Sequence, residues 1–181
     1  SDFCGSLKDH QININHRVYG LSQKIDKSSK IGSEISEFVI SQIIPLWENI
    51  KKFNIKNTPK LSRNFKLFLS PSDFGFHNIL KNKRSKLFFL DFEYSGFDDL
   101  AKLCNDFFFS SQNKIEIQQR KIFIDYIEKN IMVDDSFRSR VENLEFSYRL
   151  KWLCIMINQY TKQGLLKEDF RGNHKNIYNQ I

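Results

Sequence analysis

The chain has 181 residues, 40% of them hydrophobic and 14% aromatic, which provides a substantial core and excludes a mostly disordered protein. Its 28 Lys and Arg against 21 Asp and Glu give a formal net charge of +7, which permits a polyanionic partner without specifying one. Cys4, Cys104 and Cys154 are too scattered for a disulfide framework or a zinc site. No run of about eighteen apolar residues and no signal-peptide pattern occurs, so we expect a cytoplasmic protein without membrane partners.

The first third of the chain predicts helices. Residues 3–21 can form an opening helix that breaks around Gly20, and residues 26–30 form a polar connector. Over residues 33–50 the apolar positions recur at the helical period, and Pro45 is expected to kink or interrupt the helix. We interpret this helix as part of the core and not as a ligand site.

A strand-like segment, residues 65–69, leads into the most specific pattern of the chain. Asp73 and Asn78 lie five positions apart on a loop, and Asp91 follows an apolar run, residues 87–90. Magnesium prefers hard oxygen donors, which an amide and a carboxylate supply, so Asn78 and Asp91 are candidate Mg²⁺ ligands. Asp73 is the candidate base that accepts a hydroxyl proton when a phosphoryl group leaves ATP.

The sequence between the two candidate ligands predicts a β-hairpin. Residues 87–90 are short and apolar, as expected for a buried strand, and residues 79–80 are expected to pair with residues 87–88. The turn, residues 81–86, holds the densest basic cluster of the chain. Because no aromatic residues are interleaved with these charges, a solvated turn is favoured over a nucleic-acid contact. The pairing would bring Asn78 and Asp91 to one end of the hairpin.

The rest of the chain again predicts helices, at residues 99–110, 114–129 and 141–160. The last of these is apolar on more than one face, which is typical of a buried helix. Residues 162–181 form a polar tail that is expected to be mobile toward its end. We therefore expect a single domain over residues 1–181, mainly α (α+β), with a short β-hairpin carrying the loop and the metal-binding aspartate.

The motif resembles the aminoglycoside phosphotransferase and choline kinase family, in which H-G-D-x-x-x-x-N is followed by a short hairpin, D-[FW]-E and a helical aspartate. The resemblance covers most of the chain and implies the C-terminal lobe of a protein-kinase-like fold. It places Asp73 on the family's catalytic base, and Asn78 and Asp91 on its metal ligands. It also places Asp106 on the helical aspartate that supports the catalytic loop.

Two departures from the family matter. The family's histidine two residues before the base is Pro71 here. Upstream of Asp73, nothing resembles the glycine-rich loop or the V-A-x-K strand lysine that hold nucleotide phosphates. We therefore expect that the N-terminal nucleotide lobe is absent from this chain, and that the chain alone is inactive.

The resemblance implies an ATP-dependent enzyme that uses Mg²⁺ to move the γ-phosphoryl group to a hydroxyl of a small molecule. The acceptor stays open between an aminoglycoside, choline or ethanolamine, an amino alcohol and a sugar. One alternative is a noncatalytic kinase-like binding module, favoured by Pro71 and the absent lobe but disfavoured by the complete set of Asp73, Asn78 and Asp91. A basic helical nucleic-acid-binding domain is a second alternative, supported only by the net charge.

Four neighbouring residues are candidate substrate or supporting groups. His77 can face a phosphate, although packing beneath the loop is the favoured interpretation. Glu93 can assist the metal or hydrogen-bond the backbone. Asp98 and Asp99 can meet a cationic acceptor, while helix capping explains at least one of them equally well.

Overall fold

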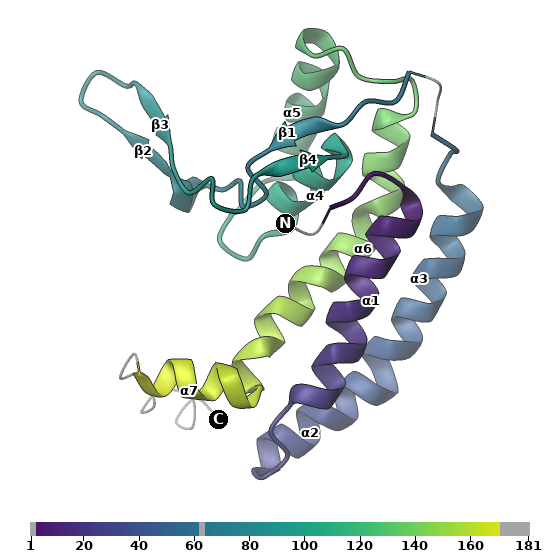
Figure 1. Cartoon of the computed structure of the whole chain (residues 1–181), viewed down its shortest axis with the longest axis vertical. Coiled ribbons are helices and arrows are strands. Elements are labelled where there is room, and N and C mark those ends of the chain that lie inside the picture. Colours follow the sequence, from purple (N-terminus) through teal and green to yellow (C-terminus); the bar gives the residue numbers. More distant parts are fainter. Residues whose placement is uncertain (1–2, 62–63, 171–181) are drawn as a thin grey trace.

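A computed structural model describes residues 3–61 and 64–170. In this part of the chain the fold is mainly helical, as predicted, with two small antiparallel sheets of two strands each (Figure 1). The helices are α1 (Leu7–Lys24), α2 (Lys30–Phe38), α3 (Ile44–Asn57), α4 (Leu100–Phe109), α5 (Ile117–Asn130), α6 (Phe137–Ile157) and α7 (Lys162–Phe170). The strands are β1 (Phe68–Ser70), β2 (Ile79–Lys81), β3 (Leu87–Phe89) and β4 (Gly96–Asp98). None of the described helices is both long and apolar enough to cross a bilayer.

Helix α1 continues through Gly20, so the break predicted there is wrong. A glycine in a helix interior costs about 1 kcal/mol relative to alanine. The neighbouring side chains Val18 and Leu21 are buried in the core, and this packing outweighs that cost. The helix begins at Leu7 because the Ser6 side chain accepts a hydrogen bond from the Asp9 backbone N–H and caps the first turn.

The interruption predicted at Pro45 is confirmed. The helical stretch divides into α2, a π-helical turn (Val39–Ile43) and α3, with Pro45 in the first turn of α3. Proline has no N–H to donate and its ring clashes with the preceding turn of an α-helix. The wider turn absorbs this conflict, and the Ile44 backbone N–H bonds the Val39 carbonyl five residues earlier.

Helix α6 contributes buried residues to both apolar clusters, in agreement with the burial predicted from its apolar character on more than one face. Its C-terminal half packs with α1, the π-helical turn and α3 around the fully buried Trp47. Its N-terminal half packs with α4 and α5 in a second apolar cluster that includes Phe107 and Tyr148. Figure 1 shows α1 and α3 running beside α6, with α4 and α5 at its other end.

Strands β2 and β3 form the predicted hairpin, in which Ile79 pairs with Phe89 and Leu80 with Phe88. The prediction that the second strand is buried is wrong, because Leu87, Phe88 and Phe89 are 48%, 43% and 48% exposed. The hairpin extends away from the helices, so both of its faces reach solvent (Figure 1). Strand β1 pairs with β4, which follows the hairpin in the chain.

The tail predicted over residues 162–181 begins as α7, which extends to Phe170. Gly164 lies inside this helix, where an added Cβ would come within 2.1 Å of the Asn158 carbonyl oxygen. Glycine is therefore required there by space. Residues 171–181 lie outside the described part of the chain, and the mobility expected of them stays a prediction.

A buried ionic cluster joins α1, α4 and α6. The Asp99 carboxylate accepts hydrogen bonds from Arg140 Nε (2.9 Å) and Nη2 (3.0 Å), and Arg140 Nη1 also donates to Asp134 over 2.7 Å. His10 Nε2 lies 3.5 Å from Asp99, and its Nδ1 is 2.7 Å from the Tyr148 hydroxyl. Burial alone would raise the pKa of Asp99, but its two cationic partners outweigh it and hold the pKa at about 2.

Stability is expected to fall between neutral and alkaline pH because of His10. Burial alone would lower its pKa, but the Asp99 carboxylate and Cys4 outweigh burial and raise the pKa from 6.5 to about 9. The folded protein therefore holds an extra proton between these values, and the free energy of unfolding falls by about 1.4 kcal/mol per pH unit across them. Urea unfolding at about pH 6 and about pH 9 measures this slope. A His10→Gln variant should lose it, and an unchanged slope in that variant would contradict the assignment.

Candidate active site

The loop between β1 and β2 turns sharply before Asp73. The Ser70 hydroxyl accepts a hydrogen bond from the Ser72 N–H over 3.2 Å, and the Asp73 N–H donates to the Pro71 carbonyl over 2.8 Å. Ser72 has a φ of 63°, a left-handed conformation that is uncommon outside glycine. The Asp73 side chain that follows is 46% exposed. Local strain of this kind is concentrated at functional sites, where surrounding contacts maintain it.

Asn78 closes the same loop through its side chain. Its Nδ2 donates to the Asp73 backbone carbonyl over 2.9 Å, and its N–H donates to the Gly75 carbonyl over 3.0 Å in a short 3₁₀ turn (Phe76–Asn78). With Nδ2 used in this way, the amide oxygen Oδ1 is the group that remains for a ligand. These two bonds close the loop and hold Asn78 against the backbone of Asp73, the residue with which the sequence analysis paired it.

The hairpin returns the chain to Asn78 immediately before Asp91. The Leu90 N–H donates to the Asn78 carbonyl over 2.9 Å, so the segment that holds Asp91 lies beside the end of the loop between β1 and β2. This confirms that the hairpin brings the two segments to one end. Asp91 is exposed and has a φ of 61°, one of three described residues other than glycine with a positive φ, together with Ser72 and Ser85 of the hairpin turn. Aspartate tolerates this conformation better than most residues, though still at a cost.

Asp73 stands between two cavities. The smaller, about 260 Å³, lies beside the hairpin, and its lining includes Asn78, Phe89 and Leu90. The larger, about 520 Å³, lies toward α4 and α6, and its lining includes Lys102 and other polar side chains. Of the described residues that line these two cavities, Asp73 is the one that they share. Asp73 is therefore the residue that borders both cavities.

Asp106 lines the larger cavity, and its bonds run to α6. Its Oδ1 accepts from Lys151 Nζ over 2.5 Å and from Trp152 Nε1 over 3.0 Å. Two other contacts link α4 to the loop between β1 and β2: Lys102 Nζ lies 3.5 Å from the Ser72 hydroxyl, and the Phe107 ring packs against Phe74 and Phe76. The supporting role expected of Asp106 toward the loop thus stays a prediction, while Lys102 is a loop contact that the sequence did not single out.

Asn113 also anchors the loop between β1 and β2. Its Oδ1 accepts from the Phe76 N–H over 3.1 Å, and its Nδ2 donates to the Phe107 carbonyl over 3.0 Å. A Cβ added at Gly75 would lie 2.5 Å from His77 Cε1 and 3.2 Å from Asn113 Nδ2, so the imidazole of His77 would have to move. Nothing local in the sequence distinguishes this asparagine from an ordinary turn former, since the contact spans 37 residues.

Of the four neighbouring candidate residues, two lie at the surface and two are buried. His77 contacts Asp73 directly, with Nε2 3.3 Å from Oδ2, and Glu93 is exposed beside Tyr94, whose pKa it raises. Asp98 and Asp99 are 0% and 2% exposed.

Both buried carboxylates have structural partners. Asp98 accepts from Lys102 Nζ over 2.8 Å and from the Cys4 N–H over 2.8 Å. Asp99 caps α4 by accepting from the Ala101 N–H and also binds Arg140, which confirms the capping alternative for this residue. Neither is therefore positioned as an open carboxylate for a cationic acceptor.

Two oxygen-bearing side chains beside the hairpin are of the kind that magnesium binds. Asn78 keeps its amide oxygen available, and Asp91 is an exposed carboxylate on the neighbouring segment. Within residues 3–61 and 64–170, no three His, Cys, Asp or Glu side chains gather as a metal-binding group. Magnesium in nucleotide sites commonly takes only one or two protein carboxylates and completes its shell with phosphate oxygens and water.

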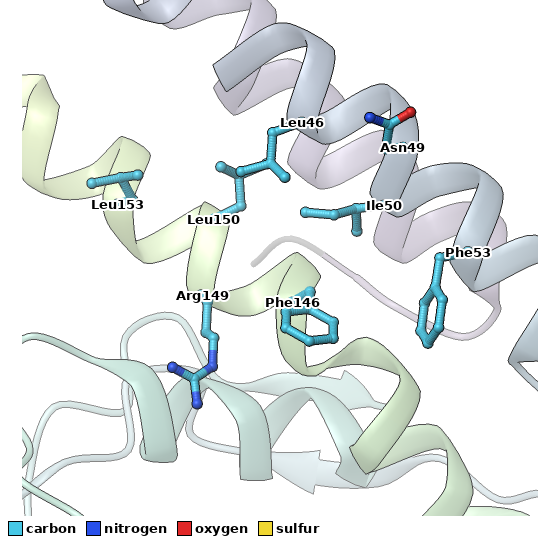
Figure 2. A pocket seen from close by; sticks show the side chains of 8 residues that line it. All are labelled: Leu46, Asn49, Ile50, Phe53, Phe146, Arg149, Leu150 and Leu153. Atoms are coloured by element: carbon cyan, nitrogen blue, oxygen red, sulfur yellow. The ribbon is translucent and has the colours of Figure 1, made fainter. Parts of the chain in front are cut away.

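A third concavity, an apolar groove of about 460 Å³, lies between α3 and α6. Figure 2 shows Leu46, Ile50 and Phe53 of α3 facing Phe146 and Leu150 of α6 across it. Arg149 is the one charged side chain among the lining residues. The groove therefore holds no acid or base for proton transfer.

Comparison with known proteins assigns no family. No protein-family model matches the chain, and no curated protein matches its sequence.

Proposed function

We propose that the chain is the catalytic C-terminal lobe of a small-molecule phosphotransferase that transfers the γ-phosphoryl group of ATP to a hydroxyl. The observation that carries the proposal is the position of Asp73 between the cavity lined by Asn78 and the larger polar cavity. Phosphoryl transfer needs one group that meets the acceptor hydroxyl beside the phosphates, and the place of Asp73 on the border of both cavities supports that role.

The residues of the loop divide the chemistry between them. An acceptor hydroxyl in the larger cavity gives its proton to Asp73 as its oxygen bonds the γ-phosphorus, the bond from that phosphorus to the β,γ-bridging oxygen breaks, and ADP leaves. His77, 3.3 Å from Asp73, and the Asn78 bond to the Asp73 carbonyl hold the carboxylate in place. Asn78 and Asp91 would hold Mg²⁺, which neutralises phosphate charge.

A nucleotide-binding lobe outside this chain is part of the proposal. The hairpin and the segment after it expose large apolar side chains, among them Leu80, Phe88 and Phe92, at 56%, 43% and 52%. Contiguous apolar surface of this kind is typical of a surface that another part of a protein covers. The absence of a phosphate-holding loop and lysine upstream of Asp73 supports the same assignment.

The 181-residue chain alone is expected to show no useful ATP turnover with any hydroxyl acceptor, because positioning of the phosphates supplies most of the catalysis. ADP release and mass spectrometry of the acceptors measure turnover, with the full protein that the gene encodes as the comparison. Turnover by the 181-residue chain near 1–100 s⁻¹, roughly the usual range of kinases, would show that no further lobe is needed. No transfer by the full protein to any acceptor would contradict the proposed function.

A noncatalytic binding module is the second candidate, and Pro71 favours it. Proline replaces the family's histidine in the turn before Asp73, although its carbonyl accepts the Asp73 N–H within the tight turn. ATP binding without transfer by the full protein would support this candidate.

A further inference from the structure

The larger cavity beside Asp73 has a lining that narrows the class of acceptor, an inference that deepens the proposed function and rests on it. At about 520 Å³ the cavity is large enough for a sugar-sized molecule. Its charged lining residues are Arg17 of α1, Lys102 of α4, Lys151 of α6, Asp73 and Asp106. When Asp98, the carboxylate that Lys102 bonds, is counted with them, three cations stand beside three carboxylates. The formal charge of the group is therefore zero.

The cations of this group are already engaged within the protein. Lys102 Nζ lies 2.8 Å from Asp98 Oδ2, and Lys151 Nζ lies 2.5 Å from Asp106 Oδ1. Both carboxylates are buried, at 0% and 5% exposure. Arg17 is not a free cation either. A charged ligand would have to displace a charge of its own sign from one of these pairs, and a buried charge that loses its partner is costly.

Neither sign of charge on the acceptor finds a counter-charge in the cavity. Of the described lining residues, Asp73 is the carboxylate that no lysine or arginine bonds, and it is the group that the acceptor hydroxyl requires. An ammonium held at Asp73 would occupy the place of the reacting hydroxyl. An anionic group would meet lysines whose charge Asp98 and Asp106 already neutralise.

The lining does offer hydrogen bonds to uncharged hydroxyls. The Lys151 ammonium has three N–H donors, and its described hydrogen bond to Asp106 uses one. The Gln112 amide both donates and accepts, and its side chain makes no hydrogen bond within the described part of the chain. Trp152 and Ile155 add apolar surface to these polar groups. Apolar surface with a few placed polar groups is the usual composition of a site for a small molecule.

We propose that the acceptor is an uncharged polyhydroxylated compound, a sugar or a polyol, bound in this cavity with one hydroxyl at Asp73. A second hydroxyl would bond the Gln112 amide, and the C–H groups of the ligand would contact Ile155 and the indole of Trp152. Such a ligand forms hydrogen bonds without separating any of the buried ion pairs, so it avoids the cost that a charged acceptor meets.

Binding to the 181-residue chain tests this inference without requiring turnover. Calorimetric titrations compare matched probes that differ in one charged group: sorbitol with gluconate, glucose with glucose 6-phosphate, and glucose with protonated glucosamine. In each pair the neutral compound should bind roughly tenfold or more tightly than the charged one. Rising salt should leave the binding of sorbitol and glucose unchanged, because no ion pair with the ligand is screened.

Two variants assign the binding to this cavity. Ile155→Trp narrows the cavity and should abolish binding of the neutral probes, whereas Met156→Trp, at an exposed neighbour that is not among the lining residues, should leave it unchanged. Gln112→Ala should weaken binding roughly threefold to tenfold, the loss expected for one or two hydrogen bonds. Gln118→Ala, at an exposed glutamine of α5, is its control. Circular dichroism and thermal unfolding confirm that each variant folds.

Several outcomes would overturn the inference. These are a charged probe that binds more tightly than its neutral match, no saturable binding of any neutral probe, or neutral binding that survives both Ile155→Trp and Gln112→Ala. Phosphorylation of a charged acceptor by the full protein at a higher kcat/KM than any neutral one would also overturn it, while the proposed function would stand. Binding of a neutral probe that depends on Ile155 and Gln112, without any phosphoryl transfer by the full protein, would instead leave the cavity assigned and the proposed function contradicted.

Discussion

Asp91→Ala is expected to abolish phosphoryl transfer by the full protein and to weaken Mg²⁺-dependent ATP binding by more than about tenfold. The carboxylate would hold the cation that bridges the nucleotide phosphates, so both the bound state and the transition state lose it. Titration of ATP with and without Mg²⁺, together with steady-state kinetics, measures the two effects. The dependence on Mg²⁺ should disappear along with the affinity.

Two variants control for backbone effects at Asp91. Because φ is 61° there, alanine also introduces strain, whereas asparagine accepts the left-handed conformation and removes only the charge. Asp91→Asn should therefore keep the stability of the parent protein but lose most of the Mg²⁺-dependent affinity. Asp135→Ala, at an exposed aspartate in the turn before α6, should bind ATP like the parent. Unchanged Mg²⁺-dependent binding in Asp91→Asn would remove Asp91 from the metal site.

Asp73→Ala should act on the rate and not on nucleotide affinity. A group that accepts the acceptor's proton contributes roughly 10²- to 10⁴-fold to the rate, so kcat should fall by that factor while the Kd for Mg–ATP changes little. Single-turnover kinetics and titration with Mg–ATP separate the two quantities. An equal loss of nucleotide binding in Asp73→Ala and Asp91→Ala would make Asp73 a metal ligand or a structural anchor. Normal turnover would exclude it from the mechanism.

Asp73→Asn provides the matched comparison at the same position. Asparagine keeps the shape of the side chain and can still contact His77, but it cannot take up the acceptor's proton. If Asp73 acts as the base, both variants should lose a similar part of kcat. A large loss in Asp73→Ala with near-normal kcat in Asp73→Asn would indicate that the side chain only orients the acceptor.

Features set by short-range chemistry were predictable from the sequence. The interruption at Pro45, the cap at Asp99 and the hairpin after Asn78 each depend on residues within a few positions of one another. The exposure of Phe88 was not predictable, because an apolar run indicates that a strand could be buried but not whether another surface reaches it.

The long-range contacts of the candidate site could not be predicted from the sequence. Lys151 and Trp152 meet Asp106 across 45 and 46 residues, and Asn113 meets the Phe76 N–H across 37. A lysine in a helix normally indicates a solvated face, and only the packing of α4 against α6 turns Lys151 into a buried partner. The motif thus indicated which side chains could perform the proposed chemistry, but not which distant residues contact the loop and Asp106.

Helix α6 links the stability of the two apolar clusters. Leu150, Cys154 and Ile157 belong to one cluster and Val141, Leu144 and Tyr148 to the other, all on one continuous helix. Loss of either cluster would strip one half of α6 of its packing partners, and an isolated helix is marginal in water. The helices therefore form one cooperative unit, while the projecting hairpin can open locally at lower cost. The arrangement that results is a rigid helical support under a loosely held hairpin.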